Sequence, residues 1–172
     1  MTFLDTNNLP PNFKLLGIVD SRRVPGEQFY VIFAHEVLYL VEKTPATAMV
    51  IRGKSIPTDE PGFNVAQFEM PTAALPWLID TIENGFWKKH SEGGLPGDVL
   101  HVDQCVQGED LRIRFSPNCG AEEIKGFTLK NYSRKGRVQN WQDIGIPYST
   151  LRDGGMLDLW KEIALKHGQG IL

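Results

Sequence analysis

The sequence lacks the features that mark membrane, secreted and metal-binding proteins. Its 172 residues contain no apolar run of the roughly 18 residues that a membrane-spanning helix needs. The first residues have neither a basic region nor an apolar stretch, so we expect no signal peptide. The two cysteines, Cys105 and Cys119, cannot form a zinc site alone, and no second Cys/His pair joins His101. We therefore expect a cytoplasmic protein without a metal or cofactor, its thiols reduced; a disulfide between them is the alternative.

Catalytic motifs are also missing. The sequence has no glycine-rich phosphate loop, no His-Glu-x-x-His and no Gly-x-Ser-x-Gly motif. Its four histidines are scattered along the chain. We therefore predict that the protein is not an enzyme.

What is present is the composition of a globular chain with many turns. Hydrophobic residues make up 41% and charged residues 23%, and there are 17 glycines and 11 prolines. Residues 1–12 are polar and end in two prolines, which predicts a flexible leader, and the glycine-rich residues 91–98 predict a linker. Two units are thereby predicted, 13–90 and 99–172, which could also form one compact domain.

Both units show strand patterns followed by a helix pattern. The aromatic and β-branched segment 28–43 predicts two strands, with a buried helix as the alternative. Proline at position 71 is compatible with the first turn of a helix. In the first unit the predicted strands are 13–20, two within 28–43, 47–54 and 62–70, and the helix is 71–89. In the second unit the predicted strands are 99–106, 110–116, 124–132 and 138–146, and the helix runs from 147 to near 166.

The two strand-to-helix junctions look alike. Met70-Pro71 is followed by Leu75, and Ile146-Pro147 is followed by Leu151, each within an apolar-x-apolar-Pro-x-x-x-Leu pattern. The repeat predicts an α+β fold of two ββββα units, each an antiparallel sheet with a helix on one face. Because the match is short, coincidence is the alternative.

Positive charge is unevenly distributed. The formal net charge is −3, yet residues 124–142 contain five basic residues and no acid. A weaker acid-free window, 43–58, contains Arg52 and Lys54. Local basic stripes on an acidic body are typical of a nucleic-acid track, and a solvated basic strand face is the alternative. The five basic residues are Lys125, Lys130, Arg134, Lys135 and Arg137.

Alternation along the strands of the second unit separates an apolar face from a face of cations and rings. If the apolar set, which includes Val138, Ile144 and Ile146, faces the helix, cations and aromatic rings share the open face. Cations follow phosphates and rings stack on unpaired bases, so this mixture suits single-stranded nucleic acid. The alternative is that the rings pack under the other unit or at a dimer contact. The predicted open face carries Arg112, Arg114, Lys130, Tyr132 and Trp141.

The element order resembles the single-stranded-DNA-binding transcription regulators, namely the Whirly, PUR-repeat and positive-cofactor-four families. The resemblance is carried by the two proline junctions and by the predicted hairpin 130–137. A Whirly signature of the Lys-Gly-Lys-Ala type is absent, and Arg52-Gly53-Lys54 is only a faint echo of it. The chain is also similar in kind to phage-encoded cofactors that bring an RNA polymerase to melted promoters.

These observations predict sequence-tolerant binding of single-stranded DNA, with RNA as a further ligand, in transcription or replication. An RNA polymerase and a second copy of the chain are the protein partners to consider, and no membrane partner is expected. The alternative is a protein-interaction module that uses the same aromatic face. The predicted nucleic-acid contacts are Arg52, Lys54, Arg112, Arg114, Lys125, Lys130, Tyr132, Arg134, Lys135, Arg137 and Trp141.

Overall fold

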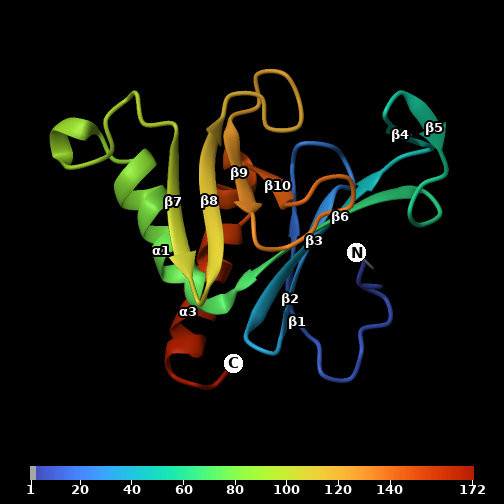
Figure 1. The fold of residues 1–172 in the computed structure, drawn as a ribbon, viewed down its shortest axis with the longest axis horizontal. Helices are drawn as coiled ribbons and strands as arrows, with labels where there is room; N and C mark the ends of the chain where they lie inside the picture. The colour runs from blue at the N-terminus through green and yellow to red at the C-terminus, as the bar shows by residue number, and fades with distance from the viewer. Residues whose placement is uncertain (1–2) are drawn as a thin grey trace.

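The computed structural model describes residues 3–172 and has the predicted α+β class, with two antiparallel four-stranded sheets (Figure 1). In each sheet the strands are neighbours in chain order, so both sheets are simple meanders. The first sheet consists of β1 (Lys14–Asp20), β2 (Gln28–Ala34), β3 (Val37–Pro45) and β6 (Phe63–Pro71). The second sheet consists of β7 (His101–Val106), β8 (Glu109–Ser116), β9 (Gly126–Asn131) and β10 (Gln142–Pro147).

A helical segment follows each sheet directly after a proline. Pro71 and Pro147 are the last strand residues, and their extended backbone turns the chain into the helix. Pro76 lies in the first turn of α1, where its missing N–H has no helical acceptor to lose. After β6 come η1 (Thr72–Ala74), α1 (Leu75–Asp80), the π-helical η2 (Thr81–Phe86) and η3 (His90–Glu92). After β10 come α2 (Tyr148–Arg152) and α3 (Met156–Gly168).

Each helical segment contacts the sheet of the other half. Phe86 and Trp87, which follow β6, pack on Phe127 of β9 with ring centroids 5.1 and 6.3 Å apart. Leu159 of α3 packs on Gly17 of β1, where a Cβ would lie 2.7 Å from the leucine Cδ2. Glycine at position 17 therefore lets α3 approach the first sheet closely. These contacts join the two halves.

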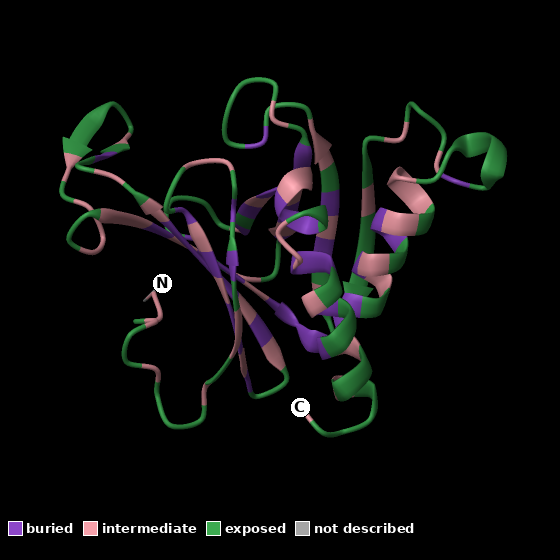
Figure 2. Cartoon of the chain, turned by 180° about the vertical axis from the view of Figure 1, so that it is seen from behind, coloured by how far each residue is buried: buried purple, intermediate pink, exposed green. Residues whose placement is uncertain are grey.

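One hydrophobic core is shared by both sheets and all the long helices (Figure 2). The largest buried side chain is Trp160 of α3, and the core includes Phe29 of β2 and Phe127 of β9. Leu75 and Leu151, the leucines of the repeated junction, are 0% and 1% exposed. Folding therefore removes the apolar faces of both halves from water in one step. This burial of apolar surface is the main contribution to the stability of the fold.

Residues 47–56 form a protruding hairpin, and the prediction of one strand over 47–54 is wrong. Its strands are β4 (Met49–Ile51) and β5 (Lys54–Ile56). Arg52 and Gly53 have φ angles of 51° and 77°, as a two-residue hairpin turn of type I′ requires. The chain therefore reverses in the middle of the predicted strand.

The segment before β1, predicted as a flexible leader, lies against the face of the first sheet that is turned away from the helices. Side chains of residues 3–13 pack on Ile32, Val41 and Val65, which are buried. The Leu4 N–H donates a hydrogen bond of 2.8 Å to the Gln67 side-chain oxygen. The first sheet is therefore covered on both faces.

The last predicted strand begins later than expected. β10 starts at Gln142, and residues 136–139 form a turn in which the Gly136 N–H donates to the Gln139 carbonyl. Val138, predicted to share the helix face with Ile144 and Ile146, is 49% exposed in this loop, so that assignment is wrong. Within residues 3–172, no helix has the length and apolar character needed to cross a membrane.

Candidate nucleic-acid interface

The face of the second sheet opposite the core carries rows of side chains fixed by the strand register. Leu111, Ile113 and Leu129 alternate toward the core and are buried, so their neighbours point outward. One outward row contains Asp103, Arg112, Lys130 and Asp143, and the next contains His101, Arg114 and Thr128. A further row contains Cys105, Asp110, Tyr132 and Trp141. We call these residues the open face.

Cations and rings are paired on the open face. The Arg112 guanidinium lies 5.4 Å from the Tyr132 ring centre, and the Lys130 ammonium lies 5.4 Å from that of Trp141. The two rings lie 6.3 Å apart at 47°. Tyr132 is 40% exposed and Trp141 is half-buried. The structure thus brings four of the predicted contact residues together as two adjacent cation–π pairs.

Arg112 also forms an ion pair across the β7–β8 hairpin. Its Nε and Nη2 donate to the two carboxylate oxygens of Asp103 at 2.6 and 2.8 Å. This hydrogen bonding lowers the pKa of Asp103. Among residues 3–172, Arg114 and Lys130 form no ion pair, and both remain available to an anionic ligand.

The open face is mixed in charge. Asp103, Asp110 and Asp143 lie between the basic side chains, and all three are exposed. These acids lie outside the acid-free windows of the sequence, and only the pairing of the strands brings them beside the basic side chains. A ligand on this face therefore meets positive and negative side chains at short intervals.

Arg134 does not extend the open face. It donates to Glu69 of β6 at 2.5 Å and to Glu109 of β8 at 2.6 and 2.8 Å. Burial opposes ionisation of Glu109, but hydrogen bonds from Arg134 and Asn131 hold its pKa below the ordinary value. Arg134 therefore clamps the two sheets together, whereas the sequence had predicted a free phosphate contact.

The other predicted residues are spread more widely. Arg137 forms an ion pair of 2.6 Å with Asp59 and lies 5.3 Å over the Phe3 ring, which fastens the β9–β10 loop to the first half. Lys135 is exposed in the same loop, and Lys125 is exposed just before β9, outside the rows. Arg52 and Lys54 are exposed on the β4–β5 hairpin.

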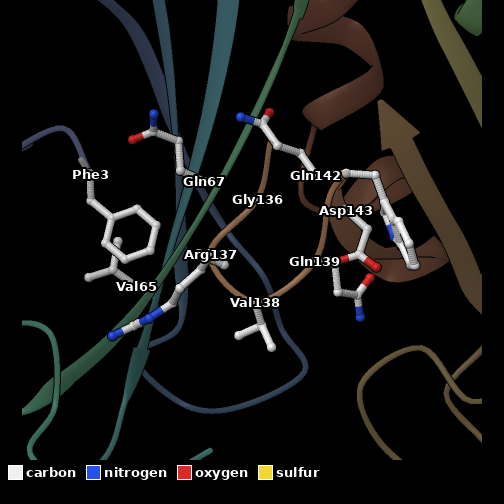
Figure 3. A pocket seen from close by; sticks show the side chains of 11 residues that line it. Phe3, Val65, Gln67, Gly136, Arg137, Val138, Gln139, Gln142 and Asp143 are labelled. Atoms are coloured by element: carbon white, nitrogen blue, oxygen red, sulfur yellow. The ribbon is translucent and has the colours of Figure 1, made fainter. Parts of the chain in front are cut away.

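A cavity of about 220 Å³ adjoins the open face (Figure 3). It lies between the leader, β6 and the β9–β10 loop, and Trp141 belongs both to its wall and to the open face. Phe3 and Val65 lie on one side of the cavity, and Gln139 and Asp143 lie on the other. The sequence could not place this cavity, because its walls come from three segments far apart in the chain.

A separate ionisable cluster is buried near the first sheet. Arg23 forms ion pairs with Glu27, at 2.5 Å, and with Glu42. The Thr44 hydroxyl donates to Glu27 at 2.8 Å. Burial raises the pKa of Glu42 to about 8 despite the attraction of Arg23, and the neighbouring Glu27 charge adds to the rise. One arginine thus faces two carboxyl groups, of which Glu42 holds its proton more tightly.

No other ligand chemistry is evident in the described chain. Cys105 is exposed, Cys119 is buried, and both are free thiols. Within residues 3–172, no three His, Cys, Asp or Glu side chains are grouped to hold a metal ion. Comparison with family models, curated proteins and solved structures finds no match to this chain.

Proposed function

We propose that the open face binds single-stranded DNA without strong sequence preference, in transcription or replication in the cytoplasm, and that the protein is not an enzyme. The observation that carries the proposal is the pair of rings, Tyr132 and Trp141, side by side with Arg112 and Lys130 on an uncovered face. Rings stack on unpaired bases of any sequence, and cations contact the phosphates between them. Duplex DNA hides its base faces and would not use the rings.

The structure narrows the set of residues that the proposal uses. Arg114 and Lys130 are the direct phosphate contacts, and exposed Lys135 extends them along the loop. Arg112 serves mainly to hold the Tyr132 ring, because its charge is already paired with Asp103. Arg134 and Arg137 support the loop through their ion pairs. The resemblance to Whirly, PUR-repeat and positive-cofactor-four proteins is consistent with this use of a sheet face and stays a proposal.

The second candidate is a protein-docking face, for an RNA polymerase or a second copy of the chain. The mixed charge of the open face favours it, because Asp103, Asp110 and Asp143 would repel phosphates but could pair with basic side chains of a partner. Electrostatic complementarity of this kind gives a protein interface its register and specificity.

A salt titration separates the two candidates. We expect a labelled oligo(dT) strand to bind at about 50 mM salt, more tightly than duplex DNA, and its affinity to fall steeply as salt rises. RNA of the same length tests the breadth of the ligand class. The matched control is Lys88→Gln with Lys89→Gln, which removes two exposed charges from the segment after η2 and should leave affinity unchanged. Absence of binding to any strand would contradict the proposal and favour protein docking.

A further inference from the structure

We propose that the cavity beside Trp141 receives one unpaired guanine base from the bound strand; this inference rests on the proposed function. The open face would then bind bases without selection, and the cavity would select at one position.

Its position places the cavity at the end of the ring pair. Tyr132 and Trp141 form a stacking platform on the open face, and Trp141 is also part of the cavity wall. A strand that stacks on Tyr132 and Trp141 therefore reaches the cavity with its next base.

Its size and walls suit one planar ring system. The cavity, about 220 Å³, is smaller than the roughly 300–1,000 Å³ typical of drug-sized ligands. The Phe3 ring and the Val65 and Val138 side chains form its apolar walls. The Arg137 guanidinium over the Phe3 ring fixes one of these walls to the β9–β10 loop. A base could thus be held between apolar groups and a few polar atoms at its edge.

The free polar atoms of the wall select the base. Asp143 is exposed, and its carboxylate forms no hydrogen bond or ion pair with residues 3–172. A carboxylate only accepts, and guanine alone among the DNA bases has two adjacent donors, N1–H and the 2-amino group, on its pairing edge. The two carboxylate oxygens of Asp143 can therefore accept from both donors of one guanine base.

The charge of Asp143 also decides which part of the strand enters. Its carboxylate at the cavity would repel a phosphate, whereas Lys130, its neighbour across the β9–β10 pair, would attract one. The phosphates would therefore follow Lys130 and Arg114 on the sheet while the base enters the cavity. Asp143 would then contact a base, which gives a role to an acidic side chain within a DNA-binding face.

The test compares four labelled strands by fluorescence anisotropy: oligo(dT), and the same strand with a single dG, dA or dC at its centre. We expect the dG strand to bind about tenfold more tightly than the dA and dC strands, within the range for a bidentate side-chain–base pair. Asp143→Asn should abolish this preference, because its amide replaces one acceptor by a donor, and should not weaken oligo(dT) binding. Asp110→Asn is the matched control, since it removes the same charge from the open face outside the cavity and should keep the preference.

The outcomes distinguish this inference from the proposed function. Equal affinities of the wild-type protein for all four strands would overturn the guanine cavity and leave the single-strand function standing. A preference that survives in Asp143→Asn would also overturn the cavity. Absence of binding to every strand would overturn both. In a second readout, the indole N–H NMR signal of Trp141, assigned with Trp141→Phe, should shift on addition of the dG strand more than with oligo(dT); equal shifts would contradict the assignment.

Discussion

The two sheets have the same strand order and end in the same proline junction, but their outer faces differ in chemistry. In the first sheet the outer face is apolar and is covered by residues 3–13. In the second sheet the corresponding positions carry cations, acids and aromatic rings, and the face is open. Counting along the paired strands gives the equivalent residues. Tyr30 corresponds to Arg112, Ile32 to Arg114, Val41 to Lys130 and Val65 to Trp141.

The strand arrangement, which the two sheets share, therefore does not by itself determine what a sheet face contacts. The same meander with apolar outer residues binds its own leader, because burying Ile32, Val41 and Val65 removes apolar surface from water. The corresponding positions of the second sheet carry Arg114, Lys130 and the Trp141 ring, which would favour a ligand with negative charge and flat rings. Under the proposed function, binding therefore depends on a few outward positions of one sheet.

The largest expected effect comes from giving the second sheet the residues of the first. Arg114→Ile with Lys130→Val should weaken oligo(dT) binding by about 1.5–3 kcal/mol for each charge, the usual contribution of a hydrogen bond to a charged group. The slope of affinity against salt should fall by about 0.7 for each lost phosphate contact. Anisotropy titrations at several salt concentrations measure both quantities. An unchanged salt slope would place the strand on another surface.

The next largest effect tests whether the halves are structural equivalents. Leu75 and Leu151 follow the two prolines at the same spacing and are both buried. Leu75→Ala and Leu151→Ala should each lower the free energy of unfolding by about 2–5 kcal/mol, the range for a core leucine. Urea denaturation measures the loss. A loss below about 1 kcal/mol at either position would end the equivalence of the junctions.

The two proline junctions are among the features that the sequence predicts well. Alternation and proline position are local signals, so the strand order of the second sheet, the helix after each sheet and the outward positions of Arg112 and Arg114 could be predicted. The Asp103–Arg112 pair could have been found as well. Gln107 and Gly108 have positive φ, and this two-residue turn fixes the hairpin register that places the two opposite each other.

The contacts that the sequence did not predict join distant segments. Arg134 meets Glu69, 65 residues away in the chain, and no local pattern marks that pair. The helices contact the sheet of the other half, which depends on the packing of the whole core. The burial of the leader against the first sheet likewise depends on which apolar face remains uncovered. The alternation of apolar and polar residues indicates which side chains point outward, but it does not indicate which distant segment contacts them.

A smaller expected effect is the pH dependence of stability, which one half should show through a buried carboxyl group that the other half lacks. Glu42 of β3 and Asn131 of β9 occupy equivalent buried positions, but only the glutamate titrates. Its pKa of about 8 lies above the ordinary value of 4.5, so between these values the folded state holds a proton that the unfolded state has lost. Stability should therefore fall as pH rises from about 4.5 to 8, by up to about 1.4 kcal/mol per unit.

Glu42→Gln should remove most of this slope and raise the melting temperature at pH 8. Thermal unfolding at pH 5 and pH 8 measures both effects. Glu27 has a lowered pKa, because the hydrogen bonds from Arg23 and the hydroxyls outweigh its burial. The stability that Glu27 contributes is present above its unfolded pKa and is lost only as the pH falls below that value. It therefore does not hide the change that Glu42 causes between about pH 4.5 and pH 8. The same slope in wild type and Glu42→Gln would contradict this assignment.

The smallest effect, and the one that tests the comparison most directly, is at Trp141 and its counterpart Val65. Val65 is 7% exposed under the leader, whereas Trp141 is half-buried with part of its ring on the open face. Trp141→Ala should weaken oligo(dT) binding by about 1–3 kcal/mol, the contribution of one stacked base, and change the melting temperature little. Val65→Ala should lower stability and leave the affinity of the folded protein unchanged. Melting curves and anisotropy on the two variants decide the roles. If Trp141→Ala instead costs about 3–5 kcal/mol of stability with intact affinity, its ring is a core residue, and the two outer faces differ less than their surfaces indicate.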